Sequence, residues 1–357
     1  LRAEHPCSQF QLCQWPCEAG PIMRSPIVLL EHASLAVESW TDELQRFWFE
    51  ALGCVSDPRA VMACAKARAA GGPLEDLRWV NIGLQQLHVS IGETVLPTDG
   101  ILGLAFTSLH NAKWRFTELG VPHELEVTED QCLQLAGPRL RLRSPSGDQV
   151  RIHGATDWFG PEGAKEAGCC PPGGPSLGLG LQYLEFACPM GSSAGIGRFY
   201  RVVMGIPVVD LGGACKVPMN TGQFLLFRET KRPMPTGNNP RVTIYVGDLQ
   251  QGDMTESFSK MYQRCKRAGV IYNNPTFPRL TYDTLEDALT HNEFRVLHIV
   301  DPAAKIAVCR VEHEIRALTH LSFSCKQLLW PRSEPEMKMR DLPPQLPEAW
   351  NWQVIGG

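Results

Sequence analysis

The chain has 357 residues, of which 43% are hydrophobic and 20% charged, and its formal net charge is −4. This composition is typical of folded globular proteins and excludes fibrous and wholly disordered chains. No block of lysine or arginine is present, which argues against a nucleic-acid partner. The best candidate for a membrane span, Ile27 to Val37, contains Glu31 and His32 and is shorter than the ~18 apolar residues required, so no transmembrane segment is expected.

The cysteine pattern indicates the redox setting. The 13 cysteines are scattered, mostly in apolar segments, for example Cys54, Cys188 and Cys309. This favours buried free thiols in a reducing compartment over a disulfide framework. The closest cluster has only half of the paired spacing of a zinc knuckle: Cys7, Cys13 and Cys17, with His5 nearby. Because Leu1 is not an initiator methionine, a processed chain that has lost an organellar transit peptide is expected.

Apolar periodicity predicts alternating strands and helices from residue 27 onward. A strand at 27–37 is followed by a helix at 38–52 that ends at Gly53, an inserted helix at 62–70, and two strands that meet at Gly83. The order repeats after Pro97, with a strand, a helix and three strands at 101–106, 109–119, 123–127, 139–143 and 149–153.

A segment rich in glycine and proline, 156–180, is expected to be a linker. Beyond it the order of elements repeats twice more, at 181–188, 195–204, 207–211 and 223–228, and at 241–246, 256–268, 294–300 and 306–311. The sequence therefore contains four copies of one unit, which predicts an α+β fold of four βαβββ modules. Residues 1–26 read as an N-terminal extension and 317–357 as a C-terminal arm.

The segment from Arg78 to Glu93 contains His88, a candidate site residue. If Leu87 and Val89 face the helical layer, the two-residue period of a strand turns His88 to the opposite face. That face either meets water or lines a cavity. Four aromatic residues at core spacings are expected to pack inside: Phe47, Trp48, Trp79 and Trp114.

The repeat and three motifs resemble the vicinal oxygen chelate superfamily, the fold of glyoxalase I and the bleomycin-resistance proteins. The motifs are Trp79-Val80-Asn81-Ile82-Gly83, Ser144-Pro145-Ser146-Gly147 and Val311-Glu312-His313-Glu314-Ile315-Arg316, which look like a tandem glyoxalase-like group of bacteria and algae without a named activity. The resemblance implies two tandem glyoxalase-like domains, at 27–155 and 181–316, each of two βαβββ modules that form a cupped mixed sheet.

In the metal enzymes of this superfamily, the first and last strand of each module point ligands into the cup, and the divalent ion acts as a Lewis acid. The resemblance places eight residues at these positions: His32, His88, Ile101 and Arg151 in the first domain, and Tyr183, Leu225 or Leu226, Arg241 and a residue near Val308 in the second. Of these eight positions, only the two histidines can bind a metal ion. A guanidinium at Arg151 would repel a cation and favour an anion.

The candidate residues are compatible with several kinds of site. His32, His88 and His153 together could bind Zn²⁺ or a similar ion, or could be satisfied polar residues of a site that has lost its activity. Arg151 could instead clamp a carboxylate or phosphate while His32 and His88 donate hydrogen bonds. The run Glu312-His313-Glu314 could supply ligands in the second domain, where the strand period allows at most Glu312 and Glu314 to act together, but a solvated strand end is the favoured interpretation.

Three functions follow from these residues. The first is a catalytically degenerate glyoxalase-like protein without a cofactor, which binds protein partners through its N- and C-terminal arms as an accessory subunit of a larger photosynthetic or respiratory assembly. An organelle, the chloroplast, is its expected location, with the cytoplasm as the alternative. The second is a metal-dependent lyase of the glyoxalase I type, an isomerase or a dioxygenase, with a divalent metal at His32 and His88 and a small α-oxygenated substrate. The third is a small-anion-binding module centred on Arg151, with His153 beside it.

Overall fold

The structure is a computed structural model that describes residues 25–57, 77–82, 85–91, 100–106, 108–127, 130, 133, 137–154, 178–219, 222–232, 240–248 and 251–325. The expected N-terminal extension up to residue 24, the inserted helix at 62–70, most of the linker and the arm beyond residue 325 lie outside the described residues. Within the described part of the chain, no helix is long and apolar enough to cross a membrane.

The first half of the chain forms two modules, as the periodicity predicts. The first contains β1 (Ile27–Val37), α1 (Asp42–Gln45), the π-helical turn η1 (Arg46–Ala51), β2 (Val55–Ser56), β3 (Leu77–Ile82) and β4 (Gln85–Ile91). The second contains β5 (Ile101–Phe106), α3 (Leu109–Glu118), β6 (His123–Glu126), β7 (Arg139–Arg143) and β8 (Gln149–Gly154).

The second half of the chain repeats this order. The third module contains β9 (Gly178–Pro189), α5 (Ser193–Arg198), the π-helical turn η2 (Phe199–Met204), β10 (Val209–Asp210), β11 (Ala214–Pro218) and β12 (Phe224–Thr230). The fourth contains β13 (Arg241–Val246), α6 (Glu256–Arg267), α7 (Leu285–His291), β14 (Glu293–Asp301) and β15 (Ile306–Ala317), and α8 (Leu321–Cys325) follows it. In every module the first strand lies parallel to the last.

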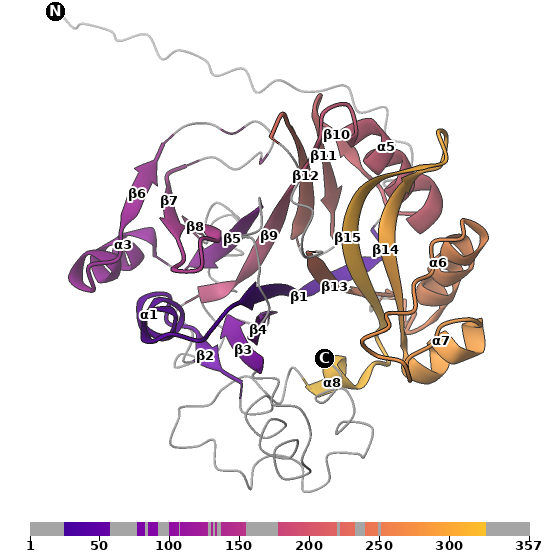
Figure 1. The fold of residues 1–357 in the computed structure, drawn as a ribbon, viewed down its shortest axis with the longest axis horizontal. Helices are drawn as coiled ribbons and strands as arrows, with labels where there is room; N and C mark the ends of the chain where they lie inside the picture. Colours follow the sequence, from indigo (N-terminus) through magenta and orange to yellow (C-terminus); the bar gives the residue numbers. More distant parts are fainter. Residues whose placement is uncertain are drawn as a thin grey trace, which may run out of the picture.

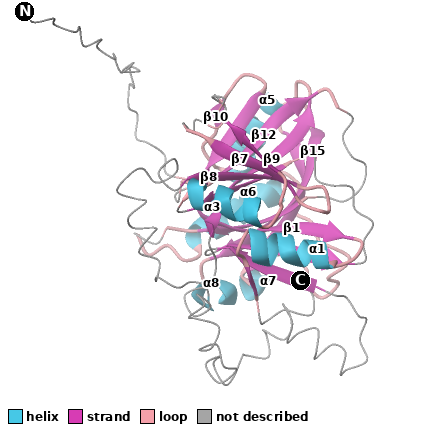
Figure 2. Ribbon diagram, turned by 90° about the vertical axis from the view of Figure 1, so that its left-hand side faces the viewer, coloured by secondary structure: helices cyan, strands magenta, loops and turns pink. Residues whose placement is uncertain are grey.

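The modules do not pair in chain order. Strand β1 pairs antiparallel with β13, so the first and fourth modules form a seven-stranded sheet, here called the outer sheet, in the order β14-β15-β13-β1-β4-β3-β2. Strand β5 pairs with β9, and the second and third modules form the eight-stranded inner sheet, β10-β11-β12-β9-β5-β8-β7-β6. Figure 1 shows indigo β1 beside β13, and Figure 2 shows β7, β8 and β9 above β1.

This pairing corrects one implication of the resemblance. It implied a sheet within 27–155 and another within 181–316, but each sheet contains one module from each half of the chain. The mixed α+β fold is confirmed, with three βαβββ modules and a fourth, β13-α6-α7-β14-β15, in which α7 takes the place of one expected strand. Where the chain would divide into separable domains stays a prediction.

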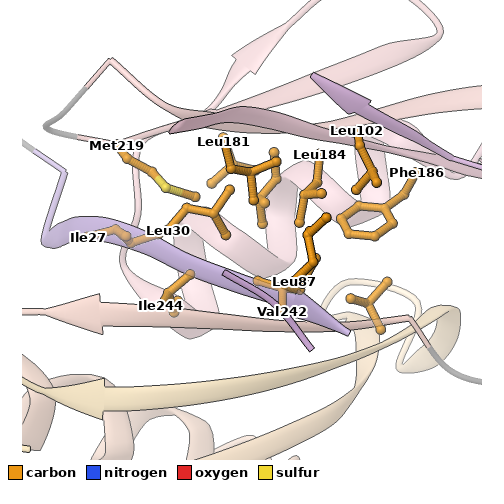
Figure 3. Packing of buried hydrophobic residues seen from close by; sticks show 14 of the residues in the cluster. Ile27, Leu30, Leu87, Leu102, Leu181, Leu184, Phe186, Met219, Val242 and Ile244 are labelled. Carbon is orange, nitrogen blue, oxygen red and sulfur yellow. The ribbon is translucent and has the colours of Figure 1, made fainter. Parts of the chain in front are cut away.

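The two sheets share one hydrophobic core. Figure 3 shows apolar side chains of the outer sheet, including Leu30, Leu87 and Ile244, facing Leu181 and Leu184 of the inner sheet. All five are buried. Burial of one such side chain is worth about 1.5–3 kcal/mol, which holds the two sheets together. Helix α5 packs against strands of both, namely β11 and β12 of the inner sheet and β14 and β15 of the outer sheet.

Hydrogen bonds also join the sheets where they meet. The Gln223 amide Oε1 accepts from the Leu30 backbone N–H at 3.0 Å, and its Nε2 donates to the carbonyls of Leu30 at 3.2 Å and Leu181 at 2.6 Å. The side chain of Gln85 passes close to Gly180, where an added Cβ would lie 2.1 Å from Gln85 Oε1. A larger residue at position 180 would have to displace the end of the Gln85 side chain.

Three of the four aromatic residues predicted to pack in the core are buried. Phe47, Trp48 and Trp79 are buried, as expected, but Trp114 is 63% exposed. Helix α3 buries Ala112 and Phe116, which lie one turn apart on one face. Trp114 is two residues from each of them and therefore points to the opposite face, so the prediction for Trp114 was wrong.

We expect Gln223→Leu to lower the free energy of unfolding by about 1–3 kcal/mol for each backbone group left unpaired. Leu30 and Leu181 would lose their amide partner in the buried region between the sheets. Urea unfolding followed by circular dichroism measures the effect, with Gln263→Leu on the exposed side of α6 as the control. Equal stability of the two variants would contradict a structural role for the Gln223 amide.

Candidate functional site

The faces of the two sheets that point away from the shared core carry the polar residues. On the outer sheet, the register places His32 of β1 opposite Gln86 of β4 and Thr243 of β13, and Thr243 opposite Glu314 of β15. These four residues form one row across the four central strands. The row lies at the first and last strands of the first and fourth modules, where the resemblance implied metal ligands.

Three rings stack on this face. His32 and His88 have ring centroids 3.7 Å apart with an interplanar angle of 20°, and His88 lies on Trp79 at 4.5 Å and 5°. Leu87 and Val89 point into the core, so the predicted orientation of His88 is confirmed. Burial lowers the pKa of both imidazoles, which are therefore neutral at pH 7.

Hydrogen bonds hold the stacked rings. His32 Nε2 and Thr243 Oγ1 are 2.8 Å apart. Gln86 donates from Nε2 to Asp57 Oδ2 at 2.5 Å and to Asn81 Oδ1 at 2.7 Å, which leaves its Oε1 as an acceptor. His88 Nε2 lies 3.3 Å from that oxygen and must donate to it, so His88 carries its proton on Nε2.

Beside the rings, Arg316 is surrounded by three carboxylates. Its Nη1 lies 2.8 Å from Glu31 Oε2, and its Nε lies 3.6 Å from Glu293 Oε2. The remaining nitrogen, Nη2, pairs with Glu314 Oε1. The side chain of Arg316 is 10% exposed, so these contacts lie away from bulk water. In such a low-dielectric environment, a guanidinium or carboxylate that loses its partner destabilises the folded protein.

A second guanidinium continues this network. Arg295 contacts Glu293 Oε1 at 2.9 Å, Glu312 Oε1 at 2.8 Å and Glu314 Oε2 at 2.9 Å. It also lies over the ring of Phe277 at 4.8 Å. The carboxylates hold the pKa of Arg295 well above its ordinary value, and the two guanidiniums hold the pKa of Glu314 well below its own, although burial opposes both shifts.

The acidic residues were predicted wrongly. Glu312 and Glu314 were expected at a solvated strand end, but each is 3% exposed. Strand β15 continues to Ala317, and the chain beyond it covers this face, with Leu318 packed on Leu29 and Tyr245. The 317–325 part of the expected arm therefore belongs to the folded unit.

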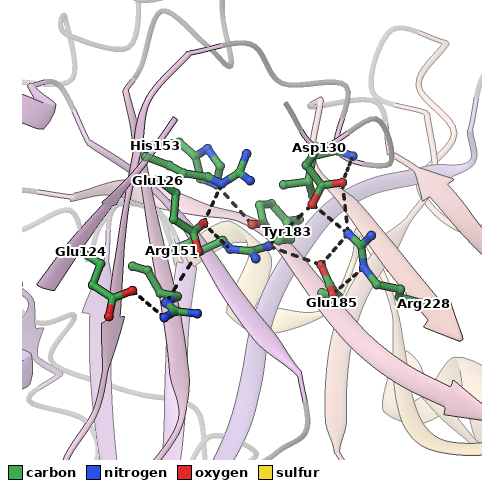
Figure 4. Close-up of polar contacts among 11 residues, drawn as sticks. Glu124, Glu126, Asp130, Arg151, His153, Tyr183, Glu185 and Arg228 are labelled. Carbon is green, nitrogen blue, oxygen red and sulfur yellow. Dashed lines mark hydrogen bonds and ion pairs between the residues drawn. The ribbon is translucent and has the colours of Figure 1, made fainter. Parts of the chain in front are cut away.

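On the inner sheet, the polar face is centred on Arg151 (Figure 4). Its Nε lies 3.2 Å from Glu126 Oε2, and its Nη1 lies 3.7 Å from Glu185 Oε2 and 3.9 Å from Asp130 Oδ2. Burial lowers the pKa of Arg151, but the Tyr183 hydroxyl and the carboxylates of Glu126 and Glu185 outweigh it and raise that pKa. Arg228 joins the same group through contacts of 2.8 Å to Glu185 and 3.0 Å to Asp130.

His153 lies on the same face as Arg151, as the strand period predicts. Its Nε2 lies 3.2 Å from the Tyr183 hydroxyl. The ring of Tyr183 lies over Gly103, where an added Cβ would be 2.1 Å from a ring atom. Burial and the neighbouring guanidiniums of Arg139 and Arg151 lower the pKa of His153 to about 4.

The predicted site residues thus separate into two groups. His32 and His88 lie on the outer sheet, whereas Arg151 and His153 lie on the inner sheet, so the expected shared cup does not form. The difference follows from the pairing of β1 with β13 instead of β5. Four residues of the outer network had no place in the predicted site: Glu31, Glu293, Arg295 and Arg316. In the sequence, charged residues stand at every second position, at 293 and 295 and at 312, 314 and 316. This spacing places them on one face of each strand.

The residues of the outer row do not fit a divalent ion in their present arrangement. Among the described residues, no three His, Cys, Asp or Glu side chains form a group that could hold a metal. Glu31 Oε2 and both carboxylate oxygens of Glu314 already contact guanidinium nitrogens, which would compete with a metal ion for them. The stacked histidines do not converge either, because their ring centroids are 3.7 Å apart and the two rings are inclined by only 20°, so they lie nearly parallel and are not directed at one point.

Comparisons with known proteins give a likeness of fold. Neither the protein-family models nor the curated proteins contain a match to the chain. Among solved structures, a proposed dioxygenase from Bacillus subtilis subsp. subtilis str. 168 has 11% identity and a TM-score of 0.49 over 89% of this chain and 97% of its own. Glyoxalase I from Zea mays has 11% identity and a TM-score of 0.45 over 80% of this chain and 91% of its own. Both TM-scores are below 0.5 and both identities are 11%, so membership of the vicinal oxygen chelate superfamily stays a prediction from the sequence motifs.

We expect the protein to lose stability as the pH falls from 6.5 toward 4. Five buried histidines have folded-state pKa values below the ordinary 6.5: His32, His88, His153, His313 and His320. The unfolded chain binds protons below pH 6.5 while these folded histidines remain neutral, so each contributes up to about 1.4 kcal/mol of lost stability per pH unit. Urea unfolding at pH 7.5, 6.5, 5.5 and 4.5 measures the slope. Constant stability across this range would contradict the buried, neutral histidines.

Proposed function

We propose that this chain is a catalytically degenerate glyoxalase-like protein that acts by binding a partner, as an accessory subunit, and not through a bound metal. One observation carries the proposal. On the outer sheet, the guanidiniums of Arg295 and Arg316 take up the carboxylates that a metal centre would need.

The energetics of burial support this proposal. A metal at the outer row would have to displace a guanidinium from Glu314 and Glu31, which are both almost fully buried. Breaking a buried ion pair without a replacement costs about 3–5 kcal/mol. Metal-dependent lyase, isomerase or dioxygenase chemistry at His32 and His88 is therefore the weaker alternative, since neither ring has a carboxylate partner free to complete a site.

The anion-binding alternative has less support on the inner sheet. The described charged groups around Arg151 number four arginines and four carboxylates, namely Arg139, Arg141, Arg151 and Arg228 with Glu124, Glu126, Asp130 and Glu185. The network is electrically balanced, and an incoming anion would compete with carboxylates already within 4 Å of Arg151. A binding role for Arg151 and His153 stays a prediction.

A described surface supports a protein partner. Trp114 of α3, Leu125 of β6 and Val127 are 63%, 49% and 69% exposed. Strand β6 is the last strand of the inner sheet in the described order, and edge strands with apolar side chains favour pairing with another chain. Partner contacts through the N-terminal extension, 1–26, and the C-terminal arm, 317–357, and the chloroplast setting stay predictions.

Elemental analysis of the purified full-length chain tests the metal-independent part of the proposal. We expect sub-stoichiometric divalent metal and a melting temperature that does not change on addition of EDTA. The variants His32→Ala and His88→Ala should have the same metal content as the wild type. A stoichiometric ion that is lost in either variant would show a metal centre and reject the proposal.

Affinity purification from the source cells tests the partner. We expect the wild-type chain to retain a protein that a Leu125→Asp, Val127→Asp variant does not retain, because the charges would oppose contact with an apolar surface. Val202→Asp is the matched control, since Val202 is 61% exposed on η2. A wild-type chain that retains nothing beyond the background, or equal retention by the edge-strand variant, would contradict an accessory role through this surface.

A further inference from the structure

The polar face of the inner sheet also carries a small apolar cluster, separate from the core between the two sheets. Leu133, which lies between β6 and β7 in the chain, is fully buried in this cluster. Five residues of the sheet surround it: Ile101, Tyr183, Ala214, Phe224 and Leu226. The register places Ile101 and Leu226 opposite Glu185, so the cluster lies on the same face as Arg151. Lys216 on β11 fixes Leu133 from the side, since its Nζ donates to the Leu133 carbonyl at 3.2 Å.

Asp130, three residues before Leu133, occupies the charged part of this face (Figure 4). Its Oδ1 and Oδ2 lie 3.2 Å and 3.0 Å from Arg228 Nη2, and Oδ2 lies 3.9 Å from Arg151 Nη1. The backbone N–H of Leu133 donates to Asp130 Oδ1 at 3.4 Å. The two residues therefore place a carboxylate against two guanidiniums and, close to it, a branched apolar side chain against the sheet.

A small carboxylic acid with a branched apolar chain would make the same two kinds of contact. Guanidinium groups bind carboxylates through charge-assisted hydrogen bonds, and small-molecule sites combine an apolar lining with a few polar groups that orient the ligand. The four arginines and four carboxylates of this face are electrically balanced. A ligand carboxylate that takes the place of Asp130 would keep this balance, because it replaces one negative charge with another.

We infer that the inner sheet has a binding site for a small carboxylic acid with a branched apolar chain, and that Asp130 and Leu133 occupy this site in the folded chain. The ligand carboxylate meets Arg228 and Arg151, and its apolar chain takes the place of Leu133 over the cluster. The inference goes beyond the proposed function, which concerns the outer sheet and a protein partner.

The test is to remove the two side chains from the full-length chain and to add 4-methylpentanoate, which has a carboxylate and the isobutyl group of a leucine side chain. We expect Asp130→Ala with Leu133→Ala to bind it in calorimetric titration at least about tenfold more tightly than the wild type, in which the site is occupied. Acetate, which lacks the chain, and 4-methylpentan-1-ol, which lacks the charge, should each bind this double variant at least about tenfold more weakly than 4-methylpentanoate.

A third substitution tests the guanidinium. Arg228→Ala in the double variant should weaken the binding of 4-methylpentanoate at least about tenfold, because it removes a charge-assisted hydrogen bond. The control is Asp210→Ala with Leu289→Ala, at two exposed positions on β10 and α7, which should bind no more tightly than the wild type.

If Asp130→Ala with Leu133→Ala does not fold alone, refolding from urea gives the same readout by circular dichroism. Recovery is then expected in 4-methylpentanoate and not in 4-methylpentan-1-ol. Equal affinity of the wild type and the double variant, equal recovery with the acid and the alcohol, or binding that Arg228→Ala leaves unchanged would overturn the inference.

Discussion

The outer sheet depends on the contacts between two buried guanidiniums and four carboxylates. Arg316 joins β15 to Glu31 on β1, and Arg295 joins β14 to Glu312 and Glu314 on β15. These charges cannot be solvated after folding, so each group has to find its partner within the sheet. The contacts therefore require the first and fourth modules, from opposite ends of the chain, to lie side by side.

The two sheets each join two modules through antiparallel first strands, but they have seven and eight strands and different surroundings. The face of the outer sheet is covered by the segment from Leu318 to Phe323, and its charges are almost fully buried. On the inner sheet, Arg228 and Arg141 remain 34% and 45% exposed, so solvent screens part of their interactions. The same kind of charge pairing thus fixes the structure of the outer sheet more strongly than that of the inner sheet.

The sequence predicts the elements well and their pairing poorly, for a physical reason. Hydrophobic period identifies most strands and helices because it depends on neighbours along the chain. Strand β13 was predicted at its observed bounds, whereas β2, β11 and α7 were not predicted. Every module begins with a similar apolar strand, so nothing local decides whether β1 pairs with β5 or β13. The orientation of His88 followed from Leu87 and Val89, whereas the burial of Glu312 depends on distant residues that cover it.

The histidines near Arg316 are neutral mainly because they are buried. Arg316 is among the charges that lower the pKa of His32, His88 and His320, in addition to their burial. A second positive charge at this place would repel the guanidinium at low dielectric. The rings therefore serve as uncharged packing, with His88 between His32 and Trp79. A face that retains two imidazoles at ligand positions can in this way be stable without a metal, because the fold supplies its own cation.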